Sequence, residues 1–395
     1  MSPDQPIQTP LKDALLREYL DDFLLVAFAV SKVLVAALLL SAFIWIPSRA
    51  NLWNRFYTQN ERTLYTPFSN WDGQHFLLLA ERGYSDPSVR YFVGCHPLFP
   101  LSIALTNTIA LNPYLSALTN VTLFSFLFLW MFYAYAQRYL GAGKAKVAVI
   151  LLLLYPSAMF LTVTYSESLF LLCLFAFLVL YGRRHWGAVV FAVLLPLAKA
   201  QGLLVACAFV VGASWQNLRI GKFEARFELR IMAGFVTGFV LGGLFYRMTT
   251  GNFWAGLEAQ KYFVAEARAT RVLAIPQFFQ YLLSSSSSWF AYNNGRLDKV
   301  FVVLLLAGIP VVMSARVPLH ICLYSILVYV PAAMGIGAMS FARYSLAAIP
   351  FLLVSMLQIC GPQKACRVLF VCLGVLFFVV QVVFVVRFAL NLWVG

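Results

Sequence analysis

The sequence predicts an all-α, polytopic membrane protein, a bundle of about 11 helices that cross or enter the bilayer. Hydrophobic residues make up 62% of the 395 residues and charged residues 11%, whereas soluble domains are about half apolar and a quarter charged. Many apolar runs approach the roughly 20 residues that span a bilayer. The short loops between alternate runs carry Lys or Arg, which is typical of cytoplasmic loops.

The net charge of +14 does not point to a nucleic-acid partner. Most of the Lys and Arg residues fall in short loops, where they set membrane orientation. The 7 cysteines contain no CxxC pair. Cys173, Cys207, Cys322 and Cys372 lie in apolar runs and are expected to pack as small hydrophobic residues. Only Cys95 falls in a predicted external loop, so a disulfide framework is not expected.

The first elements follow from the N-terminal third. Residues 1–22 are polar and are expected to form a short cytoplasmic lead-in. Residues 23–46 form the first span, which is too long for the apolar part of a signal peptide. Residues 47–96 form a long first extracytoplasmic loop. The run 97–111 is too short to span and ends before Asn112-Pro113, so we expect an interfacial or half-inserted helix.

The rest of the chain alternates across the membrane as one domain, 1–395. Residues 186–213 are too long for one straight helix and are interrupted by Pro196 and Gly202, which predicts two short helices meeting at a turn. Such breaks line protein or wet cavities and often mark ligand sites. Residues 247–298 form a second large extracytoplasmic segment, whose run Ser284–Ser288 is a lid or a linker. The other spans are expected at 114–136, 146–163, 169–181, 231–246, 300–312, 317–334, 345–359 and 368–390.

Scarce polar groups gather in residues 70–100, which hold two of the 4 histidines. Asp72 and His75 lie there three residues apart. The predicted topology also places Glu167, Lys199 and Arg343 on the extracytoplasmic side. A polytopic protein that concentrates ionisable groups at one face is expected to carry a functional site there.

Each of these residues also has a purely structural explanation. Asp72 precedes a short helical run and could cap it, or it could act as a general base. Glu167 opens a predicted span, where the helix dipole favours a carboxylate, and a catalytic carboxylate fits there equally well. Lys199 and Arg343 adjoin helix breaks and could hold a phosphate or form structural ion pairs.

Cofactor motifs are absent from the sequence. Asp72, His75 and His96 could form a metal site, but two histidines 21 residues apart are a weak signal, and neither a metal nor another cofactor is expected. The chain has no P-loop, GxGxxG or HExxH, so nucleotide-driven transport and zinc proteolysis lack support.

Five segments, in order, resemble the PIG-V family, the second mannosyltransferases of GPI-anchor assembly, and their prokaryotic relatives. The segments are WDGQHF at 71–76 with Gly83-Tyr84, HPLFPL at 96–101, YPSAMF at 155–160 followed by YSESLF at 165–170, KAQG at 199–202 and SFARY at 340–344. The chain is short for a eukaryotic member, and we expect a bacterial or archaeal homologue in the cell (inner) membrane.

The resemblance implies a GT-C glycosyltransferase that takes a hexose, with mannose favoured, from a polyprenyl-phosphate donor to a lipid, glycan or protein acceptor. Asp72 would be the base of an inverting displacement, and Glu167 would bind acceptor or order the site. Lys199 and Arg343 would neutralise the departing phosphate, since fixed cations stabilise charge that develops in the transition state.

The remaining site residues follow from the same resemblance. Gln201 and Tyr344 would assist donor-phosphate binding, and the acceptor side would be shaped by Trp71, His75, Arg90, His96 and Tyr165. Two positions depart from the family pattern. Cys95-His96 replace the usual aromatic pair before Pro97, and Lys199 and Gln201 replace an arginine and an asparagine.

Two alternatives belong to other functional classes. A transporter or flippase for a lipid-linked anion would also need intramembrane cations, but its binding site would lie near the bilayer midplane. A membrane acyltransferase would want a buried histidine base, whereas His75 and His96 fall in a loop. The clustering of charges at one face favours the glycosyltransferase.

Overall fold

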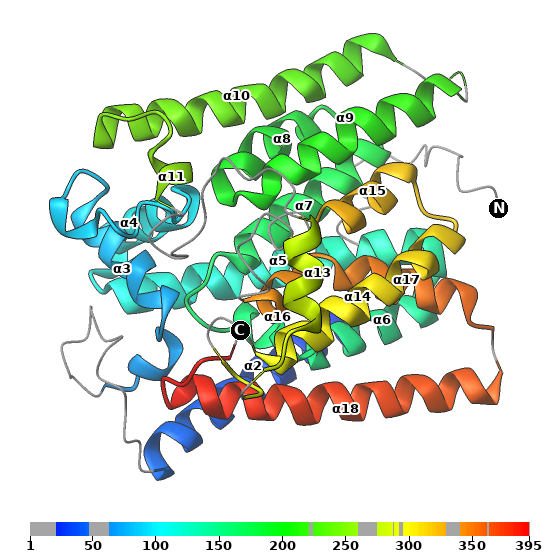
Figure 1. The fold of residues 1–395 in the computed structure, drawn as a ribbon, viewed down its shortest axis with the longest axis horizontal. Helices are drawn as coiled ribbons and strands as arrows, with labels where there is room; N and C mark the ends of the chain where they lie inside the picture. Colours follow the sequence, from blue (N-terminus) through cyan, green and yellow to red (C-terminus); the bar gives the residue numbers. More distant parts are fainter. Residues whose placement is uncertain are drawn as a thin grey trace.

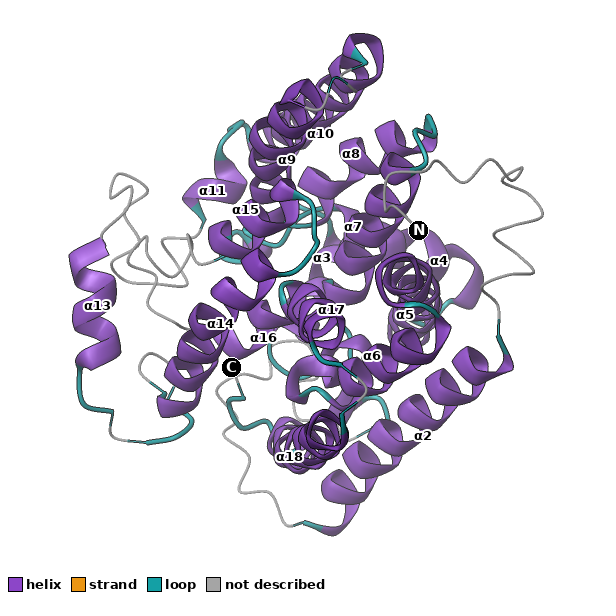
Figure 2. Cartoon of the chain, turned by 90° about the vertical axis from the view of Figure 1, so that its right-hand side faces the viewer, coloured by secondary structure: helices purple, strands orange, loops and turns teal. Residues whose placement is uncertain are grey.

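The computed structural model describes residues 21–46, 63–219, 221, 224–259, 275–286, 288–291, 295–328, 340–361 and 363–394. Within these ranges every regular element is helical (Figure 2). The predicted lead-in lies almost wholly outside the described residues, as do 47–62 of the first loop, 260–274 of the second segment and Ser287 of the serine run.

Among the described residues, six helices are long and apolar enough to cross a membrane, which confirms the all-α polytopic fold. They are α2 (Asp22–Trp45), α5 (Pro113–Leu140), α9 (Gln201–Arg219), α10 (Ala225–Thr250), α14 (Arg296–Ser314) and α18 (Lys364–Ala389). In Figure 1, α5, α10 and α18 run roughly parallel across the molecule. The expected total of about 11 inserted helices stays a prediction.

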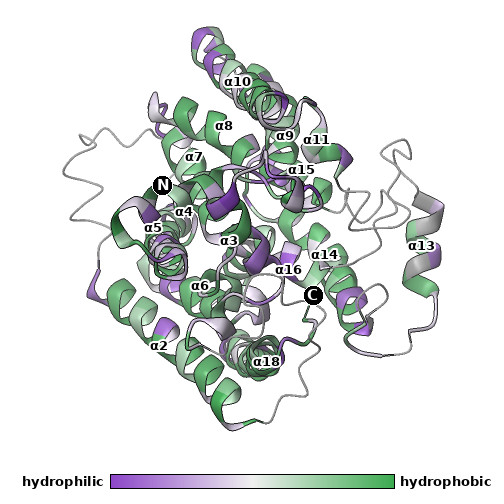
Figure 3. Cartoon of the chain, turned by 90° about the vertical axis from the view of Figure 1, so that its left-hand side faces the viewer, coloured by the Kyte–Doolittle hydropathy of each residue, from purple (hydrophilic) through white to green (hydrophobic). Residues whose placement is uncertain are grey.

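The outermost helices present apolar side chains outward. The most hydrophobic stretch of α18 has a mean hydropathy of 3.0 but is only 28% buried within the protein, and that of α2 has 2.7 and 17%. Figure 3 shows both helices as almost uniformly hydrophobic, whereas hydrophilic segments gather around α3 (Asp72–Arg82) and α16 (Phe341–Tyr344). Such large exposed apolar faces fit a surround of lipid.

The centre of the bundle is α7 (Glu167–Gly182), which packs against α5 and α8 (Gly187–Ala198). Its Phe175 ring meets Phe132 of α5 edge-on with centroids 5.3 Å apart. The same ring stacks on Phe351 of α17 (Ile349–Ile359), also at 5.3 Å. Aromatic pairs at this spacing pack favourably, so α7 fixes α5 and α17 relative to each other.

The predicted break near Lys199 is confirmed, but only the first of the two helices is short, because α9 has 19 residues. α8 ends at Ala198, Lys199 is extended, and α9 begins at Gln201. A Cβ on Gly202 would lie 2.2 Å from the carbonyl oxygen of Leu195. The first turn of α9 can therefore pack against the last turn of α8 only because residue 202 has no side chain.

Two predicted continuous spans are wrong. The span 146–163 is divided into α6 (Ala142–Leu154) and the 3-10 helix η4 (Pro156–Leu161), because Pro156 has no N–H to continue the α-helical bonding. The span 345–359 begins earlier, as α16 and η6 (Ser345–Ala347), and bends by 59° before α17, whose second residue is Pro350.

Other predicted bounds shift more modestly. α10 and α14 extend beyond the apolar runs 231–246 and 300–312 because hydrogen bonding, and not hydropathy, decides where a helix ends. The run 97–111 forms the short helix α4 (Leu98–Ala110), and its interfacial or half-inserted position stays a prediction. The remaining described elements are η2 (Thr66–Phe68), η3 (Pro87–Val89), α11 (Ala255–Glu258), α13 (Ile275–Leu283) and α15 (Leu319–Leu327).

The variant Gly202→Ala tests the close packing of α8 on α9. Its Cβ would collide with backbone, so we expect a loss of roughly 1–3 kcal/mol in the free energy of unfolding. Thermal unfolding in detergent measures this as a lower midpoint. Gly143→Ala is the control, since a Cβ there meets nothing within 4 Å. Equal midpoints for the two variants would contradict the packing described.

Candidate active site

Four charged side chains from four distant segments meet inside one end of the bundle. The Arg343 Nη1 lies 2.5 Å from Asp72 Oδ2, and its Nε lies 3.4 Å from Glu167 Oε1. The Nζ of Lys199 lies 2.5 Å from the same Glu167 oxygen. We call Asp72, Glu167, Lys199 and Arg343 the four-charge cluster.

Asp72 is the first residue of α3, and its carboxylate does not cap that helix. The N-cap is Trp71, which makes no side-chain capping bond, so the capping interpretation of Asp72 is wrong. The carboxylate turns instead to Arg343. The backbone N–H of Asp72 donates to the hydroxyl of Tyr165 at 3.2 Å, which ties the start of α3 to the segment before α7.

A close backbone approach brings Asp72 to Glu167. A Cβ on Gly73 would lie 3.2 Å from the carbonyl oxygen of Thr164, so glycine after Asp72 lets the two segments meet. The hydroxyls of Ser69 and Thr164 are hydrogen-bonded at 2.9 Å, and the Thr164 N–H donates to the Phe68 carbonyl at 2.8 Å.

Glu167 opens α7 and is almost fully enclosed, with 5% of its side chain exposed. Its Oε1 faces Lys199 and Arg343, whereas its Oε2 is buried with no hydrogen-bond partner among the described residues. The Gln201 Nε2 is also buried and has no hydrogen-bond partner among the residues that the structure describes. Buried polar atoms are nearly always satisfied, so these two atoms are candidates for hydrogen bonds to a polar ligand.

The position of Arg343 is fixed by hydrogen bonds to the backbone of Ala342, the residue before it. The Ala342 N–H donates to Asp298 Oδ1 at 2.9 Å, and the Ala342 carbonyl accepts from the hydroxyls of Ser157 and Ser345. Asp298 is 4% exposed. Sequence analysis missed this residue, although a carboxylate directly before the apolar run 300–312 was a signal for a buried role.

The backbone is strained just before α3, which carries Asp72, and just before α16, which carries Arg343. Trp71, before Asp72, has φ 56°, and Ser340, shortly before Arg343, has φ 59°. Left-handed conformations of such residues cost on the order of 1–3 kcal/mol and cluster at functional sites. Here they set the direction in which α3 and α16 begin.

Aromatic rings flank the two cations. The guanidinium carbon of Arg343 lies 5.2 Å from the ring centres of both Tyr165 and Tyr344. The Lys199 Nζ lies 5.2 Å from the Tyr344 ring. Ring faces attract cations at this range, so these rings stabilise the Lys199 and Arg343 side chains beside the carboxylates.

The other predicted residues lie at varied distances from the cluster. The His75 ring stacks on Phe92 at 3.9 Å, with its Nδ1 3.8 Å from Asp72 Oδ1. The His96 Nδ1 lies 3.0 Å from the Pro196 carbonyl oxygen, beside the α8–α9 break. Trp71 packs edge-on against Trp393. Arg90 is exposed and contacts its neighbour Tyr91, so the structure does not bring it into the four-charge cluster.

The site's electrostatics favour an ionised Asp72. Burial by itself raises the pKa of Asp72, but the nearby Arg343, His75 and Lys199 outweigh it and hold this pKa below its usual range. Burial and the Arg343 charge lower the pKa of His75 despite the neighbouring Asp72, and burial lowers the pKa of His96 to about 4. At neutral pH, both histidines are therefore uncharged.

Metal binding has little support from the arrangement. Among the residues that the structure describes, no three His, Cys, Asp or Glu side chains are grouped to hold a metal ion. The carboxylates of the four-charge cluster face Lys199 and Arg343 instead.

The fold and the site define a polytopic membrane protein with a buried cluster of two carboxylates and two cations at one end of its bundle. The sequence matches the family described as Mannosyltransferase (PIG-V) over residues 26–250, more than half of the chain. The chain belongs to this family and is a membrane glycosyltransferase. A comparison with curated proteins found no match. The matched region contains Asp72, Glu167 and Lys199, whereas Arg343 lies beyond it.

Two variants of Asp298 test the hydrogen bond between its carboxylate and the Ala342 N–H. Asp298→Ala removes the acceptor and leaves a buried N–H unsatisfied, which costs about 1–3 kcal/mol. We therefore expect a lower midpoint of thermal unfolding for Asp298→Ala. Asp298→Asn keeps a carbonyl oxygen for Ala342 and should recover most of the loss. If Asp298→Asn and Asp298→Ala unfold alike, the hydrogen bond to Ala342 is not what Asp298 contributes.

Proposed function

We propose that this protein is an inverting GT-C glycosyltransferase. It moves a hexose, with mannose favoured, from a polyprenyl-phosphate donor to a lipid, glycan or protein acceptor on the extracytoplasmic side of the cell membrane. The observation that carries the proposal is the four-charge cluster, in which a partly exposed carboxylate and two cations lie together within the bundle. That combination supplies a base for an acceptor and counter-charges for a lipid phosphate.

Asp72 is assigned as the general base. The side chain of Asp72 is 29% exposed, whereas that of Glu167 is 5% exposed, so an acceptor reaches Asp72 first. Its carboxylate takes the proton of the acceptor hydroxyl as that oxygen attacks the anomeric carbon of the sugar. The bond from this carbon to the phosphate oxygen breaks on the opposite face, which inverts the anomeric configuration and releases polyprenyl phosphate.

Lys199 and Arg343 are assigned to the phosphate. Arg has five N–H donors and Lys has three, so both can bind phosphate oxygens while still facing Glu167 and Asp72. Negative charge grows on the phosphate as the sugar leaves, and cations held in place in a buried site stabilise that charge. The lysine at residue 199 acts as a point charge, without the fork of an arginine.

Glu167 and Gln201 complete the donor side. The Glu167 Oε2 can accept from a sugar hydroxyl, and the Gln201 Nε2 can donate to a sugar or phosphate oxygen. Both atoms lack a hydrogen-bond partner among the described residues. Tyr344, next to Arg343, and Tyr165, bonded to the start of α3, hold the two cations and Asp72 in place.

Asp72→Asn tests the assignment of the base. Asn keeps the shape but cannot take a proton, so turnover should fall by about 10²–10⁴-fold. The assay follows radiolabelled polyprenyl-phosphate mannose with purified protein in detergent and a crude lipid extract as acceptor. Glu81→Gln, an exposed carboxylate on the same helix, should retain activity. Wild-type turnover in the Asn variant would remove Asp72 from the chemistry.

The pH profile distinguishes Asp72 from His75 as the base. The pKa of Asp72 lies below its ordinary value, which is about 3.9, so the ionised base persists as pH falls until that lower value. We expect activity to be flat from about pH 5 to pH 8 and its acid limb to lie below about pH 4. An acid limb near pH 6 that disappears in His75→Asn would instead assign the base to His75.

A further inference from the structure

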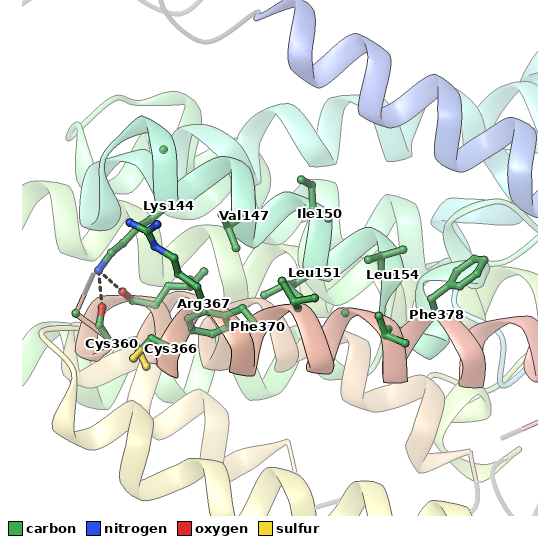
Figure 4. Close-up of a pocket in the computed structure, with 16 residues that line it drawn as sticks. Lys144, Val147, Ile150, Leu151, Leu154, Cys360, Cys366, Arg367, Phe370 and Phe378 are labelled. Atoms are coloured by element: carbon green, nitrogen blue, oxygen red, sulfur yellow. Dashed lines mark hydrogen bonds between the residues drawn. The ribbon is translucent and has the colours of Figure 1, made fainter. Parts of the chain in front are cut away.

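A large apolar groove lies away from the four-charge cluster, between α6 and α18 (Figure 4). Its volume is about 770 Å³. The side chains of Leu151, Leu154 and Phe378 line it along most of its length. The lining also includes Lys144 and Arg367, and Figure 4 shows both at the same end of the groove.

The groove opens toward the lipid. Val371 and Val375, on its α18 wall, are 66% and 60% exposed, and α18 is the most hydrophobic of the candidate spans. Gly374 on α18 is buried and faces the α6 wall, where an added Cβ would lie 3.5 Å from Leu154 Cδ1 and 3.6 Å from Leu151 Cδ2. A hydrocarbon chain fits such a surface, since the side chains along α6 and α18 beyond the charged end are mostly apolar.

The charged end is built for an anion. The lining contains two cations and no carboxylate. Lys144 is engaged, because its Nζ donates to the carbonyl oxygens of Leu357 and Cys360 at 2.6 and 2.7 Å. Arg367 is exposed, and its guanidinium has no ion pair or hydrogen bond with any described residue. Its charge is therefore available to a ligand.

We propose that this groove binds an anionic phospholipid of the bilayer, with the head-group phosphate at Arg367 and an acyl chain along α6 and α18. A cationic pocket between membrane helices on the cytoplasmic side is typical of anionic head-group binding. Lys144 lies in the first turn of α6 and Arg367 in the first turn of α18, and the positive-inside rule assigns both of these helix ends to the cytoplasm. The site is independent of the proposed transferase function.

The phosphate of the sugar donor does not occupy the charged end of this groove. The cluster end of α18 is near Ala389, whose backbone lies beside Asn70. Arg367 is 22 residues earlier on the same helix, or about 33 Å at 1.5 Å per residue. A donor whose phosphate sits at Lys199 and Arg343 therefore cannot place that phosphate at Arg367.

Photo-crosslinking in nanodiscs tests the proposal. The probes are phosphatidylglycerol and phosphatidylcholine that carry the same photoreactive acyl chain, and labelled peptides are mapped by mass spectrometry. Phosphatidylglycerol should label α6 and α18 about fivefold more than phosphatidylcholine, as one surface cation contributes. Arg367→Gln should bring this ratio to about one. Lys364→Gln, an exposed neighbouring cation outside the groove, should leave the ratio within twofold of wild type.

Gly374→Leu fills the groove and should reduce labelling by both lipids. The thermal unfolding midpoint of each variant shows that the protein is folded, and Arg367→Gln changes only an exposed side chain. Equal labelling by the two lipids in the wild type would overturn the proposal. So would a ratio that Arg367→Gln leaves unchanged, or one that Lys364→Gln lowers as much as Arg367→Gln does, because the latter would show general surface attraction.

Discussion

The organisation of this protein depends on one buried guanidinium, that of Arg343, shared between two carboxylates. It reaches Asp72 across 271 residues of sequence and also faces Glu167, which holds Lys199. A buried charge without a partner destabilises a protein by several kcal/mol. The four charges therefore stabilise one another only when the four segments that carry them come together. These segments are the start of α3, the start of α7, the α8–α9 break and α16.

The surrounding structure departs from ideal helices where the site requires it. Trp71 and Ser340 adopt left-handed backbone conformations, Lys199 separates two helices, and buried polar atoms of Glu167 and Gln201 remain without hydrogen bonds among the described residues. Each feature is unfavourable alone, and natural proteins concentrate such features at functional sites. The packed aromatic centre around Phe175 provides the rigid frame that holds them.

Sequence reasoning predicted the bundle well because apolar runs and Lys/Arg loops report directly on lipid contact. It predicted the broken helix at Lys199 from Pro196 and Gly202, and it placed the four charges on one side from topology alone. It did not predict the interruption at Pro156 or the bend before α17, since hydropathy carries no information about the backbone path. Asp298 was missed because its partner is the backbone N–H of Ala342, which the sequence does not show, although its place before an apolar run hinted at burial.

The central claim is that Asp72 and Arg343 form an energetically coupled pair. A double-mutant cycle on the free energy of unfolding tests it, with Asp72→Asn, Arg343→Gln and the double variant. Because each single change already removes the interaction between the two side chains, the double variant should be more stable than the sum of the two losses implies, by roughly 0.5–3 kcal/mol. Strictly additive losses would contradict the pairing and, with it, the account of how the site is assembled.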